Sequence, residues 1–224
     1  MAREKRETAS EERCDQEWSM VPLTVNDLIP LEEYASRRRE FFDSHRRYLD
    51  RYRRVRIGPR LTLIFENRQT LWFRVQEVVR IARLAEARQL EQELDLYNRL
   101  LPGKDLLQAA LLIETGEDAE TAEDIAAWRD LRGEQLCLRI GDVSFPATLV
   151  TCRPEDRCAG TAHWVQFFIE PRLHLTLAEF DTPAHFVFDN GRYQRESDEL
   201  SADLRQSLLD DLELSGRDEE RHAA

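Results

Sequence analysis

Residues 31–55 carry apolar side chains every three or four positions, the spacing of one face of an α-helix. The apolar stripe consists of Leu31, Tyr34, Ala35, Phe41, Phe42, Tyr48, Leu49, Tyr52 and Val55. Pro30 suits the first position of a helix, and Gly58 followed by Pro59 is a strong stop signal. The pattern therefore predicts a long N-terminal amphipathic helix that ends shortly before Gly58.

The rest of the chain alternates between helical and strand patterns. Further helices are predicted over 71–85, 90–101, 119–131, 171–180 and 201–214. Strands are predicted over 61–66, 107–114, 136–140, 143–147, 163–170 and 184–188. Gly141 and Asp142 form the turn of a hairpin, and Pro146 places the second strand of that hairpin at a sheet edge. We expect an α+β fold with an antiparallel or mixed sheet of about five to six strands and helices packed on it.

The ends of the chain are polar, and no linker divides its middle. We expect a disordered N-terminus over 1–20, a single α+β domain over 21–214 and a loose charged tail over 215–224. The first residues lack the apolar core of a signal peptide, and no apolar run is long enough to span a membrane. These features predict a cytoplasmic protein with reduced cysteines and no membrane partner.

Charge is unevenly distributed along the chain. The formal net charge is −12, which argues against broad nucleic-acid binding. Residues 37–60 nevertheless contain ten Arg and three acidic residues, a local charge of +7. Two interpretations stay open: a docking face that includes Arg46, Arg47 and Arg51, or a solvated face neutralised by acidic residues near 120 or near the C-terminus.

A second group of polar residues lies off the apolar stripe of the helix predicted over 71–85. Gln76, Glu77 and Arg80 fall within one turn, and Tyr97 and Asn98 could approach them from the next helix. The group could form a polar pocket in which Glu77 is a general base and Arg80 binds an anion. The alternative is a salt bridge that fixes one element against another.

Cysteine and histidine residues in the second half offer a possible metal site. Cys152, Cys158, His163 and His174 are suitable ligand types, but the cysteine spacing is wider than in structural zinc sites. The simpler interpretation is two ordinary loop cysteines beside a strand histidine. No cofactor is predicted.

Several short motifs together resemble a known family. They are LTVNDLIPLEEY (23–34), RRVRIGPRLTLIFENRQT (53–70), VQEVVRI (75–81), ELDLYNRLLP (93–102), LLIE (111–114), HWVQFFI (163–169) and DTPAHF (181–186). This series resembles the bacterial domain of unknown function 3501 family over residues 21–212. That family has no assigned activity. The resemblance implies a role beside a rubrerythrin-like protein and an iron–sulfur oxidoreductase of the heterodisulfide-reductase type.

Two hypotheses about function follow. The first is a non-catalytic accessory or interaction protein in a redox system, with an iron–sulfur oxidoreductase or a rubrerythrin-like protein as its partner. This hypothesis fits the strong charge segregation and the lack of a complete catalytic set of residues. The alternative is a metal- or cofactor-binding protein, or a small-molecule enzyme, that uses the Cys, His and Glu residues named above.

Overall fold

The structure is a computed structural model that describes residues 21–114, 131–150 and 162–222, with side chains as far as residue 212. The described helices are η1 (Val25–Asp27), α2 (Leu31–Tyr52), α3 (Arg68–Ala82), α4 (Ala87–Asn98), η2 (Gly133–Gln135), η3 (Pro171–Leu173), α6 (His174–Ala178) and α7 (Ala202–His222). The strands are β1 (Arg54–Ile57), β2 (Leu61–Phe65), β3 (Leu106–Ile113), β4 (Leu136–Ile140), β5 (Val143–Leu149), β6 (Ala162–Phe168), β7 (Ala184–Asp189) and β8 (Gln194–Glu196).

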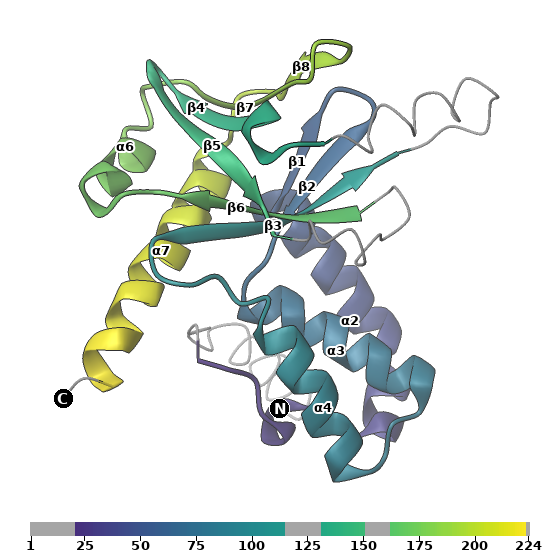
Figure 1. Cartoon of the computed structure of the whole chain (residues 1–224). Helices are drawn as coiled ribbons and strands as arrows, with labels where there is room; N and C mark the ends of the chain where they lie inside the picture. Colours follow the sequence, from purple (N-terminus) through teal and green to yellow (C-terminus); the bar gives the residue numbers. More distant parts are fainter. Residues whose placement is uncertain (1–20, 115–130, 151–161, 223–224) are drawn as a thin grey trace, which may run out of the picture.

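The strands form one strongly curved sheet in the order β1-β2-β3-β6-β5-β4-β7-β8, and every recorded pairing is antiparallel. Its two ends return to each other, because a single bridge joins Ile57 at the end of β1 to Ser197 just after β8. The sheet is therefore a nearly closed barrel (Figure 1). The α+β class and the antiparallel sheet expected from the sequence are confirmed.

The inward face of this sheet forms the main core together with α7. Alternate residues of β2 and β3, such as Leu63 and Leu111, are fully buried and point to the same side as the α7 leucines. These are Leu204, Leu208, Leu209 and Leu212. The helix pattern predicted over 201–214 is therefore a core stripe, and α7 continues to His222, into the stretch predicted as a loose tail.

Helices α2, α3 and α4 form a separate layer beside the sheet (Figure 1). A second apolar cluster, which includes Leu71, Val75 and Leu94, joins α3 to α4. Leu23 belongs to the same cluster, so the segment before α2 packs against these two helices.

The predicted count of five to six strands was wrong, because the described residues form a sheet of eight strands. The long helix was predicted to run to about Val55, but α2 ends at Tyr52 and Arg54–Ile57 forms β1. Gly58, with φ of 62°, makes the turn from β1 into β2. The Gly-Pro signal therefore marks a hairpin turn, not the end of the helix. β8 has only three residues, all exposed, and lacks the apolar pattern that reveals a strand.

The prediction that Pro146 marks an edge strand was also wrong. β5 lies inside the sheet, between β4 and β6. Pairing with β4 covers Val143 to Pro146, whereas pairing with β6 begins only at Ala147. Pro146 thus lies just outside the hydrogen-bond ladder with β6. Proline has no backbone N–H, but at this position no carbonyl of β6 depends on that donor.

The helix predicted over 119–131 and the N-terminus predicted over 1–20 lie outside the described residues, apart from Leu131. Within the described ranges, every helix is too short or too polar to cross a bilayer.

Candidate functional site

Glu77 on α3 is the centre of a charged cluster between α2 and α3. Arg38 of α2 donates to both carboxylate oxygens, at 2.9 Å from Nη2 to Oε2 and 3.0 Å from Nε to Oε1. Arg80 donates at 2.9 Å and the Tyr34 hydroxyl at 2.9 Å. Burial raises the pKa of Glu77, but the hydrogen bonds from Arg38, Arg80 and Tyr34 outweigh it and lower the pKa to about 2. The predicted Glu77–Arg80 pair is present, and Glu77 is held as a carboxylate.

The other members of the predicted polar pocket bind the chain segment before α2. Gln76 is buried and makes two hydrogen bonds with the backbone of Ile29, accepting from its N–H at 2.8 Å and donating to its C=O at 3.2 Å. Asn98 makes the same pair of bonds with Leu23, at 2.7 and 2.9 Å. Tyr97 packs half-buried against the α3–α4 cluster, and burial raises its pKa. The five residues therefore do not surround one common space.

The candidate metal ligands are not brought together by the described part of the chain. Cys152 and Cys158 lie outside the described residues. His163 lies near one end of β6, whereas His174 follows the other end and contacts the C=O of Ile169 at 2.9 Å and Asp105 at 3.3 Å. Among the described side chains, no three His, Cys, Asp or Glu residues lie close enough to share a metal ion.

Most of the arginines between residues 37 and 60 have intramolecular partners. Arg37 and Arg39 pair with acids of their own helix, and Arg38 pairs with Glu77. Arg51 binds Asp203 at the start of α7 at 2.8 Å, Arg53 binds Asp211 of α7, and Arg54 binds Asp50. The C-terminal helix thus neutralises part of the positive charge, as one of the two interpretations of the sequence required.

Arg46 and Arg47 differ from these arginines. Both are exposed on α2, and neither forms an ion pair with any described residue. Of the three predicted docking arginines, two are therefore available at the surface, and Arg51 is engaged with Asp203.

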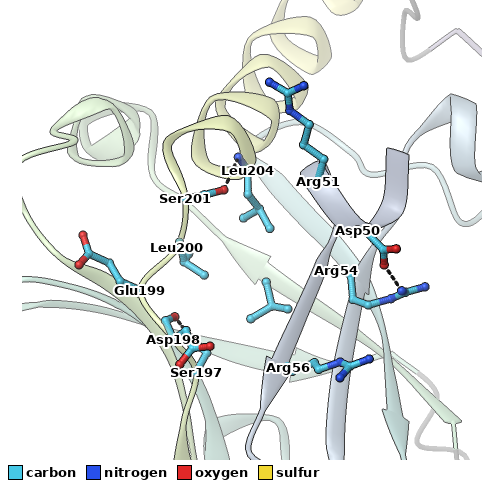
Figure 2. A pocket seen from close by; sticks show the side chains of 11 residues that line it. Asp50, Arg51, Arg54, Arg56, Ser197, Asp198, Glu199, Leu200, Ser201 and Leu204 are labelled. Carbon is cyan, nitrogen blue, oxygen red and sulfur yellow. Dashed lines mark hydrogen bonds and ion pairs between the residues drawn. The ribbon is translucent and has the colours of Figure 1, made fainter. Parts of the chain in front are cut away.

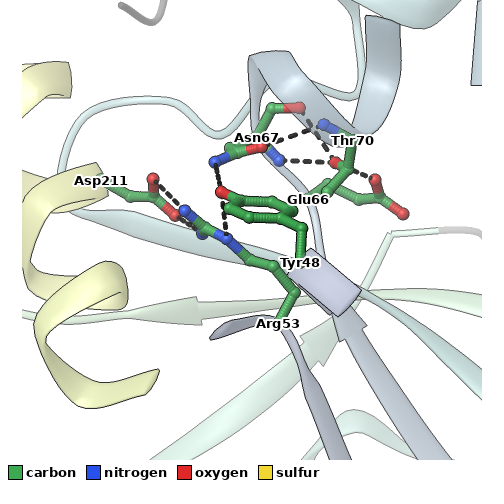
Figure 3. A network of polar contacts seen from close by, with 6 residues as sticks. All are labelled: Tyr48, Arg53, Glu66, Asn67, Thr70 and Asp211. Carbon is green, nitrogen blue, oxygen red and sulfur yellow. Dashed lines mark hydrogen bonds and ion pairs between the residues drawn. The ribbon is translucent and has the colours of Figure 1, made fainter. Parts of the chain in front are cut away.

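A buried polar network fixes the corner where α2 passes into β1 (Figure 3). Arg53 is 3% exposed and binds Asp211 with two guanidinium nitrogens. Its Nε donates to the Tyr48 hydroxyl at 2.9 Å, and the amide of Asn67 donates to the same hydroxyl at 2.9 Å. Removing one partner of such a buried pair costs about 3–5 kcal/mol. The network thus holds α2, β1, α3 and α7 in fixed relative positions.

Next to this corner lies the place where the barrel fails to close, which we call the seam (Figure 2). It is a hollow of about 460 Å³ between β1 and the chain over 197–201, which leads into α7. Val55, Leu200 and Leu204, each at most 5% exposed, contribute its apolar lining. Charged residues surround it: Asp50, Arg51, Arg54, Arg56, Asp198 and Glu199.

The sequence did not reveal the seam, apart from its lining residue Arg51. It depends on β1, which was assigned to a helix, and on a segment about 140 positions further along the chain. One signal was present: Arg54, Val55, Arg56 and Ile57 alternate between polar and apolar, and the structure has Val55 and Ile57 buried.

Comparison with known proteins places the chain in a family. The model of the family described as "Protein of unknown function (DUF3501)" matches residues 22–212. A crystal structure described as a novel protein of unknown function from Burkholderia pseudomallei is similar, with a TM-score of 0.76 and 26% identity, and covers 86% of this chain and 100% of its own. No curated protein matches the sequence. The chain therefore belongs to the DUF3501 family.

Proposed function

We propose that this member of the DUF3501 family is a non-catalytic interaction protein whose exposed arginines on α2 dock an acidic partner. The observation that carries the proposal is the contrast within one segment. Six arginines between residues 37 and 54 bind acids of the same chain, whereas Arg46 and Arg47 face solvent without an ion pair to the described residues. Clustered unpaired charges act mainly through the rate and specificity of association.

The surroundings of these two arginines support a docking role. The Tyr48–Arg53–Asp211 network fixes the C-terminal end of α2. His45 is stacked on Phe73 of α3, with ring centres 3.9 Å apart, and fixes α2 against α3. A rigid helix presents charged side chains with little loss of backbone entropy on binding.

The partner we propose is the one implied by the family resemblance, an iron–sulfur oxidoreductase of the heterodisulfide-reductase type or a rubrerythrin-like protein. In this account the chain itself needs no metal, because the redox centre belongs to the partner. Electrostatic docking suits transient redox complexes, whose interfaces are small and form quickly.

The test is charge reversal at Arg46 and Arg47 with a matched control. Arg46→Glu/Arg47→Glu should weaken binding to the partner at least about tenfold at low salt, because like charges would then face each other. Arg88→Glu is the control, since Arg88 is also exposed but lies on α4 and not on α2. Arg51 is left intact, because its reversal would also break the contact with Asp203. Equal affinities for both variants would show that this face does not dock the partner.

A further inference from the structure

Phe42 is an aromatic residue exposed on the surface of α2. It is 44% exposed, and among the exposed large apolar residues of the described ranges it alone lies on this helix. Single exposed apolar residues are common on protein surfaces and need no special explanation. Phe42 differs from them in two respects: its ring is held in place by neighbouring side chains, and it lies beside an arginine without an ion pair to the described residues.

Contacts on two sides hold the Phe42 ring. On one side it packs against the ring of Phe73 on α3, with ring centres 6.4 Å apart. Phe73 is in turn stacked on His45. From the preceding turn of α2, the guanidinium of Arg38 lies 5.8 Å from the centre of the Phe42 ring, and Glu77 binds that guanidinium. The exposed ring therefore has little rotamer freedom to lose when a partner covers it.

Arg46 follows Phe42 by one turn of the same helix. Residues four apart in a helix lie on one face, so these two side chains are neighbours on the surface. Arg46 is exposed and forms no ion pair with the described residues. Aromatic residues and arginine are the types enriched in the cores of protein interfaces. The docking face thus has an apolar point beside its available positive charge.

We propose that Phe42 is the anchor of the docking face and enters an apolar pocket of the partner protein whose rim carries carboxylates. The pocket is apolar because the covered part of the ring leaves water there. The rim is acidic because guanidinium groups lie one turn before and one turn after the ring. These are Arg38, whose side chain is 42% exposed, and Arg46.

This inference rests on the proposed function, since it names the apolar centre of the same docking face. The two ideas can fail separately, because salt affects the two kinds of contact differently. Contacts of exposed charges speed association and weaken as the ionic strength rises. An apolar contact in the centre of an interface mainly slows dissociation and is not screened by salt.

The experiment measures association and dissociation rates of the full chain with the purified iron–sulfur oxidoreductase proposed above. Phe42→Ala should weaken binding about tenfold, through faster dissociation, at low and at raised salt alike. Phe168→Ala is the matched control, since Phe168 is 56% exposed but lies on β6, and it should leave both rates unchanged.

Each other outcome has a definite meaning. Unchanged dissociation of Phe42→Ala, together with weak binding of Arg46→Glu/Arg47→Glu, would keep the docking face and reject the anchor. If the wild-type chain does not bind the oxidoreductase, both the proposed function and the anchor are wrong.

Two further variants separate anchoring from a loss of folded protein. Phe42→Leu keeps an apolar side chain that can enter the pocket and should retain most of the affinity. Phe42→Gln places a polar side chain there and should bind as weakly as Phe42→Ala. Urea unfolding of all variants gives their stability. Equal affinities of the Leu and Gln variants, or losses of affinity that follow the losses of stability, would overturn the proposal.

Discussion

His45 shows how burial can make a histidine sensitive to acid. It stacks on Phe73 with an interplanar angle of 11°. Burial, together with the positive charges of Arg74 and Arg54, lowers its pKa to about 4. Its ordinary value is about 6.5, so between these two pH values the unfolded chain binds a proton that the folded chain does not. His45 therefore favours unfolding as the pH falls through this range.

The change His45→Phe keeps a ring against Phe73 and removes the titrating group. Relative to the wild type, the variant should gain about 3 kcal/mol in free energy of unfolding between pH 7 and pH 4, which corresponds to the lowered pKa. Urea titrations at several pH values measure this difference. A constant difference across the range would contradict the account.

Glu77 should change the free energy of unfolding in a lower pH range than His45 does. Its folded pKa of about 2 lies below the ordinary value, so its stabilising effect is present above about pH 4.5 and is lost as the pH falls towards 2. Glu77→Gln should be less stable than the wild type by roughly 2–3 kcal/mol at pH 7. This difference in free energy of unfolding should disappear as the pH falls below about 3. Acid unfolding curves of both proteins provide the measurement, and a gap that persists at pH 2 would show that packing is responsible.

Arg205 on α7 binds four backbone carbonyls although it is 1% exposed. It donates to the C=O groups of Leu177, Thr182, Thr176 and Glu179, at 2.7 to 3.2 Å. Arg205→Met should cost at least about 3 kcal/mol of stability, because these buried acceptors lose a charged donor. Arg195→Met, at an exposed position, is the matched control in urea unfolding. A loss below about 1 kcal/mol would show that water replaces the guanidinium.

At the scale of elements, β1 explains most of what the sequence could and could not predict. The helices α2, α3 and α4 and six of the strands have local patterns, and each was predicted within a few residues. β1 has only four residues and adjoins a helix of matching apolar spacing, so its strand character depends on pairing with β2. β8 likewise depends on β7, because its own residues carry no apolar alternation.

Hydrogen exchange of the protein tests which backbone amides of β1 are paired with β2. The amides of Val55 and Ile57 face β2 and should exchange slowly, whereas those of Arg54 and Arg56 face the seam and should exchange faster by at least about tenfold. Uniform protection along β1 would mean that the amides of Arg54 and Arg56 are also hydrogen-bonded in solution.

At the scale of the whole molecule, the charges of α2 and α7 must be considered together. The sequence identified the excess of arginine, but only the fold brings Asp203 and Asp211 to Arg51 and Arg53. The seam also depends on a long-range contact: the alternation over 54–57 could have indicated β1, but not the segment that lies across the gap from it. The predicted polar residues Gln76, Glu77 and Asn98 were found in specific contacts, although those contacts hold segments of the chain together.

The central claim is that this protein works by binding a partner through the exposed arginines of α2. The most direct measurement is native mass spectrometry of the chain purified gently from its own host at low salt. We expect the chain to travel with an iron–sulfur or rubrerythrin-like partner, and raised ionic strength to separate the two because it screens surface charges. A chain that carries its own metal or cofactor and travels without any partner at low salt would contradict the account.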